Sequence, residues 1–130
     1  MKTTFKFDDV RRMGLVLPGV EESTTYGAPS LKVRAKLLTC PAIHKSAEPG
    51  SIVVRIGFDQ RQELMTEAPE IYYLTDHYVN YPAVLVRLSR VDADALQGLI
   101  RMSWQYVTHE ISSRKRTPRK LKPSLTTRKR

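Results

Sequence analysis

The pattern of apolar and polar positions predicts one helix near the N-terminus and a longer one before the basic C-terminal segment. Phe7, Val10 and Leu17 recur at helical spacing, and this first helix should end at Pro18. The later helix is capped by Asp92 and has an apolar face too wide for a surface helix, so it should lie across a sheet. The apolar residues of this face are Leu96, Leu99, Ile100, Met102, Trp104, Tyr106 and Val107.

Between these helices the apolar residues follow patterns that are typical of strands. Five strands are predicted, at residues 30–34, 36–43, 51–56, 71–74 and 83–89. The other segments are a polar loop at 21–27, a tight turn at Arg34-Ala35, a turn at 45–50 and a short helix that Asp59 caps and that runs to about Ala68. Hairpin-length connections join the first three strands, so the sheet should be mainly antiparallel. This order predicts an α+β domain whose N- and C-terminal helices cover one face of the sheet and leave the other open.

Residues 75–89 are the most informative stretch of the chain. A loop rich in aromatic and polar residues, which contains His77, Tyr78 and Tyr81, leads to Pro82, a residue suited to the start of a strand. The strand that follows is apolar on both parities, as expected for a central strand covered on most of its two faces, and Arg87 interrupts it. An aromatic loop that feeds a mostly buried strand with one arginine is a candidate binding site.

The alternation of side chains along strands assigns the basic residues of the sheet to one face. If Val54 and Val86 point toward the helices, then Leu85 points away from them, toward the open face. The basic residues that the same rule places on the open face are Lys32, Arg34, Arg55 and Arg87. Guanidinium groups beside aromatic rings suit phosphates and stacked bases, and they suit a small anionic molecule equally well.

A second interpretation of the same residues is purely structural. Each arginine would then pair with an acid and only complete the surface, because half-buried arginines are normally paired. Candidate partners include Glu63, Glu67 and Asp76. The aromatic residues of the loop would only pack, with their hydroxyl groups satisfied.

The net charge of +9 is concentrated at the C-terminal end. Residues 114–130 hold nine of the 22 lysines and arginines and none of the 13 acids, so residues 1–113 are neutral by count. The segment has two prolines and no helical periodicity. We therefore expect a single domain over 1–113 and a disordered basic tail over 114–130, which would bind phosphates with little sequence preference.

Residues that could carry catalysis or bind a metal are few and scattered. His44, His77 and His109 lie more than 30 residues apart, and Cys40 with His44 supplies only two of the ligands that a zinc site needs. We expect no catalytic residue, metal or cofactor, with His77 the only plausible general base if the protein were an enzyme. The single cysteine favours a reduced, cytoplasmic protein, and no apolar run approaches the roughly 20 residues of a membrane helix.

Several short motifs, in this order and spacing, resemble those of the MmcQ/YjbR family of small bacterial proteins over roughly residues 5–110. They are Phe7-Asp8-Asp9-Val10, Leu17-Pro18-Gly19-Val20, Tyr26-Gly27, Lys36, His77-Tyr78, Tyr81-Pro82, Val84-Leu85-Val86-Arg87-Leu88 and Trp104. The resemblance implies a frataxin (CyaY)-like α+β domain and a DNA-binding role. The family often has glycine before the strand lysine, where this chain has Ala35, and the basic tail lies outside the shared region. The first helix lacks the acidic ridge through which frataxins bind iron, so the resemblance does not extend to iron.

These observations together predict a non-enzymatic DNA-binding protein of the MmcQ/YjbR type. The alternative is a protein that binds or sequesters a small anionic ligand on the sheet face, and the lesser alternative is an enzyme. The predicted nucleic-acid- or anion-binding residues are Lys32, Arg34, Lys36, Arg55, Arg87, Arg114, Lys115, Arg116, Arg119 and Lys120. The predicted ligand loop contributes His77, Tyr78 and Tyr81.

Overall fold

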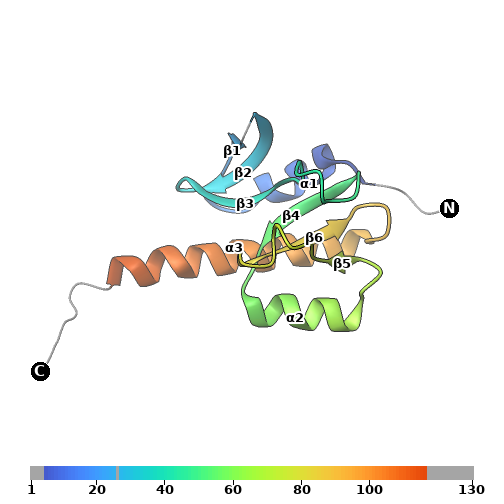
Figure 1. The fold of residues 1–130 in the computed structure, drawn as a ribbon. Coiled ribbons are helices and arrows are strands. Elements are labelled where there is room, and N and C mark those ends of the chain that lie inside the picture. The colour runs from blue at the N-terminus through green and yellow to red at the C-terminus, as the bar shows by residue number, and fades with distance from the viewer. Residues whose placement is uncertain (1–4, 26, 117–130) are drawn as a thin grey trace, which may run out of the picture.

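The computed structural model describes residues 5–25 and 27–116, with side chains described up to Ile111. The elements follow one another as α1 (Phe7–Leu15), β1 (Val20–Thr25), β2 (Ala28–Val33), β3 (Lys36–Pro41), β4 (Ser51–Arg55), α2 (Phe58–Glu67), β5 (Tyr72–Tyr73), β6 (Ala83–Arg87) and α3 (Ala93–Arg116). Figure 1 shows α3 running behind the sheet and projecting past it at its C-terminal end. The last three residues of α3 belong to the segment that the sequence predicts to be disordered, and residues 117–130 lie outside the described part.

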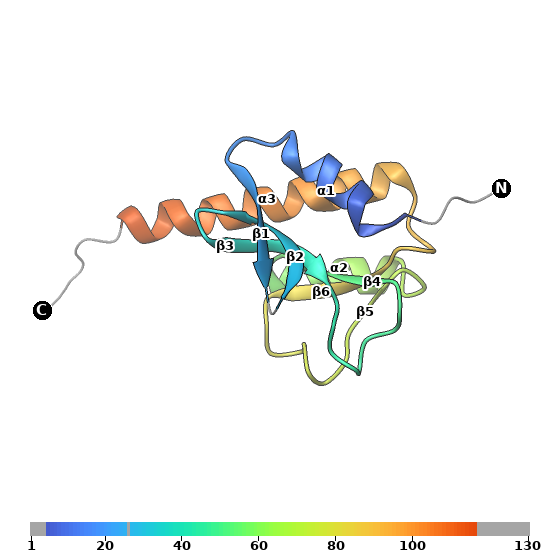
Figure 2. The same ribbon diagram turned by 90° about the horizontal axis from the view of Figure 1, so that it is seen from above.

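The strands form one antiparallel sheet in the order β1-β2-β3-β4-β6-β5. The helices α1 and α3 lie together on one face of this sheet, as Figure 2 shows from above, and α2 packs near β5 and β6. The α+β prediction is therefore confirmed, with six strands in the described residues rather than five.

The core between the sheet and the terminal helices confirms the predicted strand parity. Alternate residues of β4 and β6, such as Val54 and Val86, are fully buried in one cluster with Val10 of α1 and Ile100 of α3. A bulge in β3 makes Leu38 the extra residue, because Leu31 pairs with Thr39 whereas Lys32 pairs with Leu37. As a result, Leu37 and Cys40 both lie on the opposite face of the sheet, where they belong to a second core cluster.

The prediction that this second face is open is wrong over its centre. Leu85 has no exposed surface, and Val53 and Ala83 are also buried. Two connections cover them, the β3–β4 loop at 42–50 and the β5–β6 loop at 74–82, which contribute Ala47 and Tyr78 to the cluster. A strand that is apolar on both parities thus has both of its faces covered, as its sequence indicates.

Two local predictions also differ from the structure. Residues 20–25 form the edge strand β1, paired with β2, where the sequence predicts a loop over 21–27. The strand escapes a search for alternation because Glu21, Glu22 and Ser23 are all exposed, and it is recognised by its backbone pairing with β2. The helix α2 begins at Phe58 with Gly57 as its N-cap, so Asp59 lies in the first turn rather than at the cap.

The predicted turn at Arg34-Ala35 and the predicted helix cap at Asp92 are confirmed. Arg34 and Ala35 both have positive φ, at 50° and 69°, and join β2 to β3 as a two-residue hairpin. Asp92 caps α3 through its carboxylate Oδ1, which accepts a hydrogen bond of 2.8 Å from the backbone N–H of Ala95.

The contact between α1 and β2 depends on the absence of a side chain at Gly14. A Cβ added to this buried glycine would stand 2.4 Å from Leu31 Cδ1, and Leu31 is itself fully buried. We predict that Gly14→Ala lowers the free energy of unfolding by about 1–3 kcal/mol, because Leu31 must repack. Urea unfolding followed by circular dichroism measures this change.

Gly98→Ala is the matched control. Gly98 is an exposed residue of α3 with nothing within 4 Å of an added Cβ. This substitution should therefore raise the free energy of unfolding, by up to about 1 kcal/mol, through helix propensity alone. Equal effects of the two substitutions would show that the close approach of α1 to β2 is not a stabilising contact.

Candidate functional site

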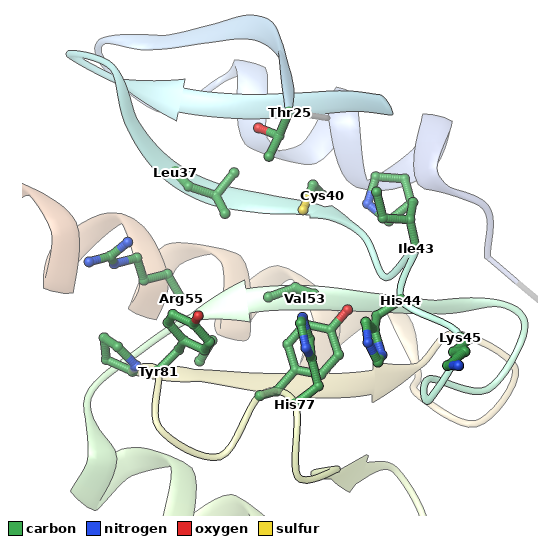
Figure 3. Close-up of a pocket in the computed structure, with 14 residues that line it drawn as sticks. Thr25, Leu37, Cys40, Ile43, His44, Lys45, Val53, Arg55, His77 and Tyr81 are labelled. Carbon is green, nitrogen blue, oxygen red and sulfur yellow. The ribbon is translucent and has the colours of Figure 1, made fainter. Parts of the chain in front are cut away.

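A cavity of about 820 Å³ lies on the sheet face opposite α1 and α3. Its floor is apolar and comes from β3, β4 and β6, and its wall comes from the β3–β4 and β5–β6 loops (Figure 3). The lining residues are Thr25, Leu37, Cys40, Pro41, Ile43, His44, Lys45, Val53, Arg55, His77, Tyr78, Tyr81, Pro82 and Ala83. This volume lies within the range typical of small-molecule sites, roughly 300–1,000 Å³. Within the described part of the chain, the lining contains two cations, Lys45 and Arg55, and no carboxylate.

A group of aromatic rings joins the two loops that form the wall. The imidazoles of His44 and His77 stack with their centroids 3.6 Å apart and their planes 8° from parallel. The Tyr78 ring meets both imidazoles edge to face, at 6.2 Å from His44 and 4.7 Å from His77. A hydrogen bond of 2.8 Å between the hydroxyl groups of Ser46 and Thr75 also links the two loops. The stack therefore holds residues that are 33 positions apart in the sequence against each other.

The environment of the stack favours a neutral imidazole at His44. Partial desolvation lowers the pKa of His44, and the nearby charges of His77 and Lys45 lower it further. Neutral rings stack without repulsion, whereas two protonated imidazoles at this distance would repel each other. The lowered pKa thus favours an uncharged His44 ring in the stack.

Arg55 is the guanidinium group of the cavity, and its pairing is incomplete. Its Nη2 lies 3.9 Å from Oε1 of Glu110 on α3, a distance too long for a hydrogen bond. Arg55 Nε and Glu110 Oε1 are both buried, and neither has a hydrogen-bond partner among the described residues. A buried donor without an acceptor costs about 1–3 kcal/mol. Because Nε itself is inaccessible, an anionic ligand would meet the part of the Arg55 side chain that stays exposed, 28% of its surface.

Arg87, by contrast, is saturated with protein partners. Its Nε and Nη2 bind the two carboxylate oxygens of Glu48 at 2.9 and 2.6 Å, and its Nη1 donates to the carbonyl oxygens of Pro69 and Glu70. The same guanidinium lies 4.2 Å from the centroid of the Tyr73 ring. The structural interpretation of the sheet arginines, in which each pairs with an acid, therefore describes Arg87.

The structure does not bring the other predicted basic residues into the cavity. Lys32 donates from Nζ to the carbonyl oxygen of Thr24 at 3.1 Å, and Arg34 and Lys36 lie at the β2–β3 hairpin. Arg114, Lys115 and Arg116 form the end of α3, and Arg119 and Lys120 lie outside the described residues. The predicted basic face thus divides into a hairpin group, one cavity arginine and one arginine bound to Glu48.

The predicted ligand loop is placed at the cavity, and all three of its residues line it. His77 and Tyr81 are exposed, whereas Tyr78 is partly buried against the second core cluster. Desolvation raises the pKa of Tyr78, so its hydroxyl stays protonated at neutral pH. His77 and Tyr81 are thus accessible to a ligand, and Tyr78 packs edge to face against His77.

Comparison with known proteins places the chain in a family. A sequence model of the YjbR family matches residues 15–106, more than two thirds of the chain. The chain belongs to the YjbR family. This result confirms the resemblance that the short motifs indicate, and the matched range of the YjbR domain includes every residue that lines the cavity.

One solved structure has the same fold as this YjbR domain, and curated proteins match part of its sequence. The crystal structure of the Deinococcus radiodurans protein DR2400, a DUF419 domain, is similar with a TM-score of 0.69 and 22% sequence identity, over 88% of this chain and 90% of that one. Uncharacterized proteins of Mycobacterium bovis and Mycobacterium tuberculosis are 42% identical over 41 residues, which is 32% of this chain and 32% of each of them. The match thus spans about a third of the length of these relatives.

No three histidine, cysteine, aspartate or glutamate side chains of the described residues converge in a way that could hold a metal ion. None of the helices described is both long and apolar enough to cross a bilayer.

Three residues that contact the predicted site residues could not be recognised as such from the sequence: His44, Glu48 and Glu110. The spacing of His44 suggests only a metal ligand, and its partner His77 is too distant in sequence to be recognised. Glu48, the partner of Arg87, is separated from it by 39 positions, and Glu110 is separated from Arg55 by an even longer stretch. All three contacts are long-range, so only the fold reveals them.

Proposed function

We propose that this YjbR-family protein is a non-enzymatic domain that binds a small organic anion in the cavity over the second face of the sheet. The observation that carries this proposal is Arg55, a partly exposed arginine that lines the cavity and whose contact with Glu110, at 3.9 Å, is too long for a hydrogen bond. A lining with two cations, no acid and an apolar floor favours a ligand that is partly apolar and negatively charged.

The state of the cavity side chains supports binding rather than catalysis. Burial raises the pKa of the Cys40 thiol, which stays protonated and is therefore a weak nucleophile. His44 and His77 are stacked on each other and joined to Ser46, Thr75 and Tyr78, so their arrangement serves the wall of the cavity. The site thus offers shape and charge without an activated nucleophile.

The proposal predicts that anion binding depends on Arg55. A charge-assisted hydrogen bond contributes about 1.5–3 kcal/mol, so Arg55→Met should weaken the binding of small carboxylates and phosphate esters by about 10- to 100-fold. Isothermal titration calorimetry of the folded variants against a panel of such compounds measures this loss.

Arg34→Met is the control for the loss of one positive charge. Arg34 is exposed at the β2–β3 turn and does not line the cavity, so its replacement should change the affinity less than about twofold, because solvent and salt screen its charge. The proposal fails if Arg55→Met binds every compound as well as the unaltered protein, or if no compound of the panel binds the unaltered protein.

A second candidate function is non-specific DNA binding at the far end of the molecule. The β2–β3 hairpin, with Arg34 and Lys36, packs through Val33 on Val107 and Ile111 of α3. Figures 1 and 2 both show α3 projecting past the sheet at this end. Arg114, Lys115 and Arg116 complete the helix, and the segment after them holds six more lysines and arginines and no acid. This concentration of positive charge favours phosphate contacts.

We predict that the affinity for DNA falls steeply with salt, and that the C-terminal segment causes most of this dependence. A chain that ends at Arg116 should bind duplex DNA more weakly, and its slope of log K against log salt should flatten by about 0.9 for each phosphate that the shorter chain no longer neutralises. Fluorescence anisotropy from about 50 mM salt upward measures both quantities. Equal slopes for the two chains would exclude the segment as the DNA-binding element, and the absence of binding at the lowest salt would exclude DNA as a partner.

A further inference from the structure

The second face of the His77 ring is turned toward the cavity. Figure 3 shows His77 between His44 and Tyr81, so that His44 covers one face of the imidazole and Tyr81 stands on the other side. The centroids of His77 and Tyr81 are 6.5 Å apart, and their planes are 48° from parallel. Two rings at this separation do not stack on each other, because stacked carbon atoms lie about 3.5–4.0 Å apart.

The separation of His77 and Tyr81 is close to what one inserted ring requires. A planar ring between two others needs about 3.5 Å on each side, or about 7 Å in total. Tyr81 is 55% exposed, so its side chain can rotate toward a parallel orientation without disturbing the core. His77 is held by its stack on His44 and by the edge of Tyr78, and it provides the fixed side of the slot.

The surroundings of this slot select a ligand that combines a flat ring with a negative charge. Val53 and Ala83 form part of an apolar floor that excludes water from one edge of a bound ring. Figure 3 places Arg55 on the same side of His77 as Tyr81, and Arg55 lines the same cavity. The guanidinium group of Arg55 points away from His77 and Tyr81, toward α3, so an anionic substituent reaches it by extending from the slot past Tyr81.

From this geometry we infer that the ligand is a planar aromatic anion whose ring inserts between His77 and Tyr81. This inference rests on the proposed function and narrows it from small organic anions to aromatic carboxylates and aromatic phosphates. The His44–His77 stack is then the platform on which the ring lies, and Arg55 binds the anionic group. Aromatic stacking of this kind tolerates different ring substituents, since every flat ring presents a π-face.

The test compares two carboxylates that differ in planarity but not in charge. The probes are 2-naphthoate and its fully saturated analogue, decahydro-2-naphthoate, titrated into the full chain by calorimetry. Stacking contributes about 1–3 kcal/mol, so we expect 2-naphthoate to bind at least about fivefold more tightly than the saturated compound. His77→Ala and Tyr81→Leu should each remove most of this preference and leave the affinity for the saturated compound within about twofold.

Phe58→Leu is the control for the loss of one exposed aromatic ring. Phe58 is 50% exposed on α2 and does not line the cavity, so its replacement should leave the preference intact. Equal, Arg55-dependent affinities for the two probes would overturn the aromatic inference while the anion-binding function stands. Binding of neither probe, together with a negative panel of small anions, would overturn both.

A preference for 2-naphthoate that survives both His77→Ala and Tyr81→Leu would also overturn the inference, because the ring would then bind elsewhere. The two substitutions are at exposed positions, so circular dichroism should show the same fold for both variants and for the unaltered protein. A change that only loosened the wall would weaken both probes equally, whereas loss of stacking weakens 2-naphthoate alone.

Discussion

The cavity of this YjbR domain depends on one arginine that holds the β3–β4 loop and the segment before β5 against the sheet. Arg87, the last residue of β6, binds Glu48 of the β3–β4 loop through both carboxylate oxygens and binds two backbone carbonyl groups just before β5. Its guanidinium also lies over Tyr73, whose hydroxyl accepts a hydrogen bond from the backbone N–H of Glu48 at 2.8 Å. The hydrogen bonds from Arg87 lower the pKa of Glu48, which keeps that carboxylate charged. A bidentate pair of this geometry fixes orientation as well as distance.

The β3–β4 loop that Arg87 positions is joined to the β5–β6 loop by the His44–His77 stack and the Ser46–Thr75 hydrogen bond, and these two loops give the sheet its second buried face. Leu85 and Val53 are covered because the β3–β4 and β5–β6 loops lie over them, and the uncovered remainder of the face becomes the cavity. The two sheet arginines therefore have different roles. All the nitrogen atoms of the Arg87 guanidinium donate hydrogen bonds to protein groups. Arg55, at the opposite end of the β4–β6 pairing, retains a buried donor without an acceptor among the described residues. This difference, rather than the number of basic residues, is the reason for proposing Arg55 as the anion-binding residue.

Local sequence patterns predict most of the elements, because the causes of those elements are local. The helical spacing from Phe7 onward, the Arg34-Ala35 turn and the parity of β4 and β6 are all confirmed. The edge strand β1 escapes prediction because an exposed strand needs no alternation. The cover on the second face escapes it because this cover comes from loops, whose contacts cannot be read from periodicity. The site itself is predicted only in part, since His77 and Arg55 acquire their roles from His44 and Glu110, which lie far away in sequence.

Hydrogen exchange of an Arg87→Met variant tests most directly whether this arginine holds the loops over the sheet. If it does, the backbone amides of Ala47 and Glu48 in the β3–β4 loop should exchange faster. The amide of Tyr78 should do so too, because the His44–His77 stack joins the β5–β6 loop to the β3–β4 loop, while the amides of α3 keep their protection. Arg12→Met, which removes an exposed arginine that pairs with Asp8 and Asp9 on α1, should change none of these rates. Unchanged protection of both loops in Arg87→Met, or an equal loss of protection in α3, would contradict the account.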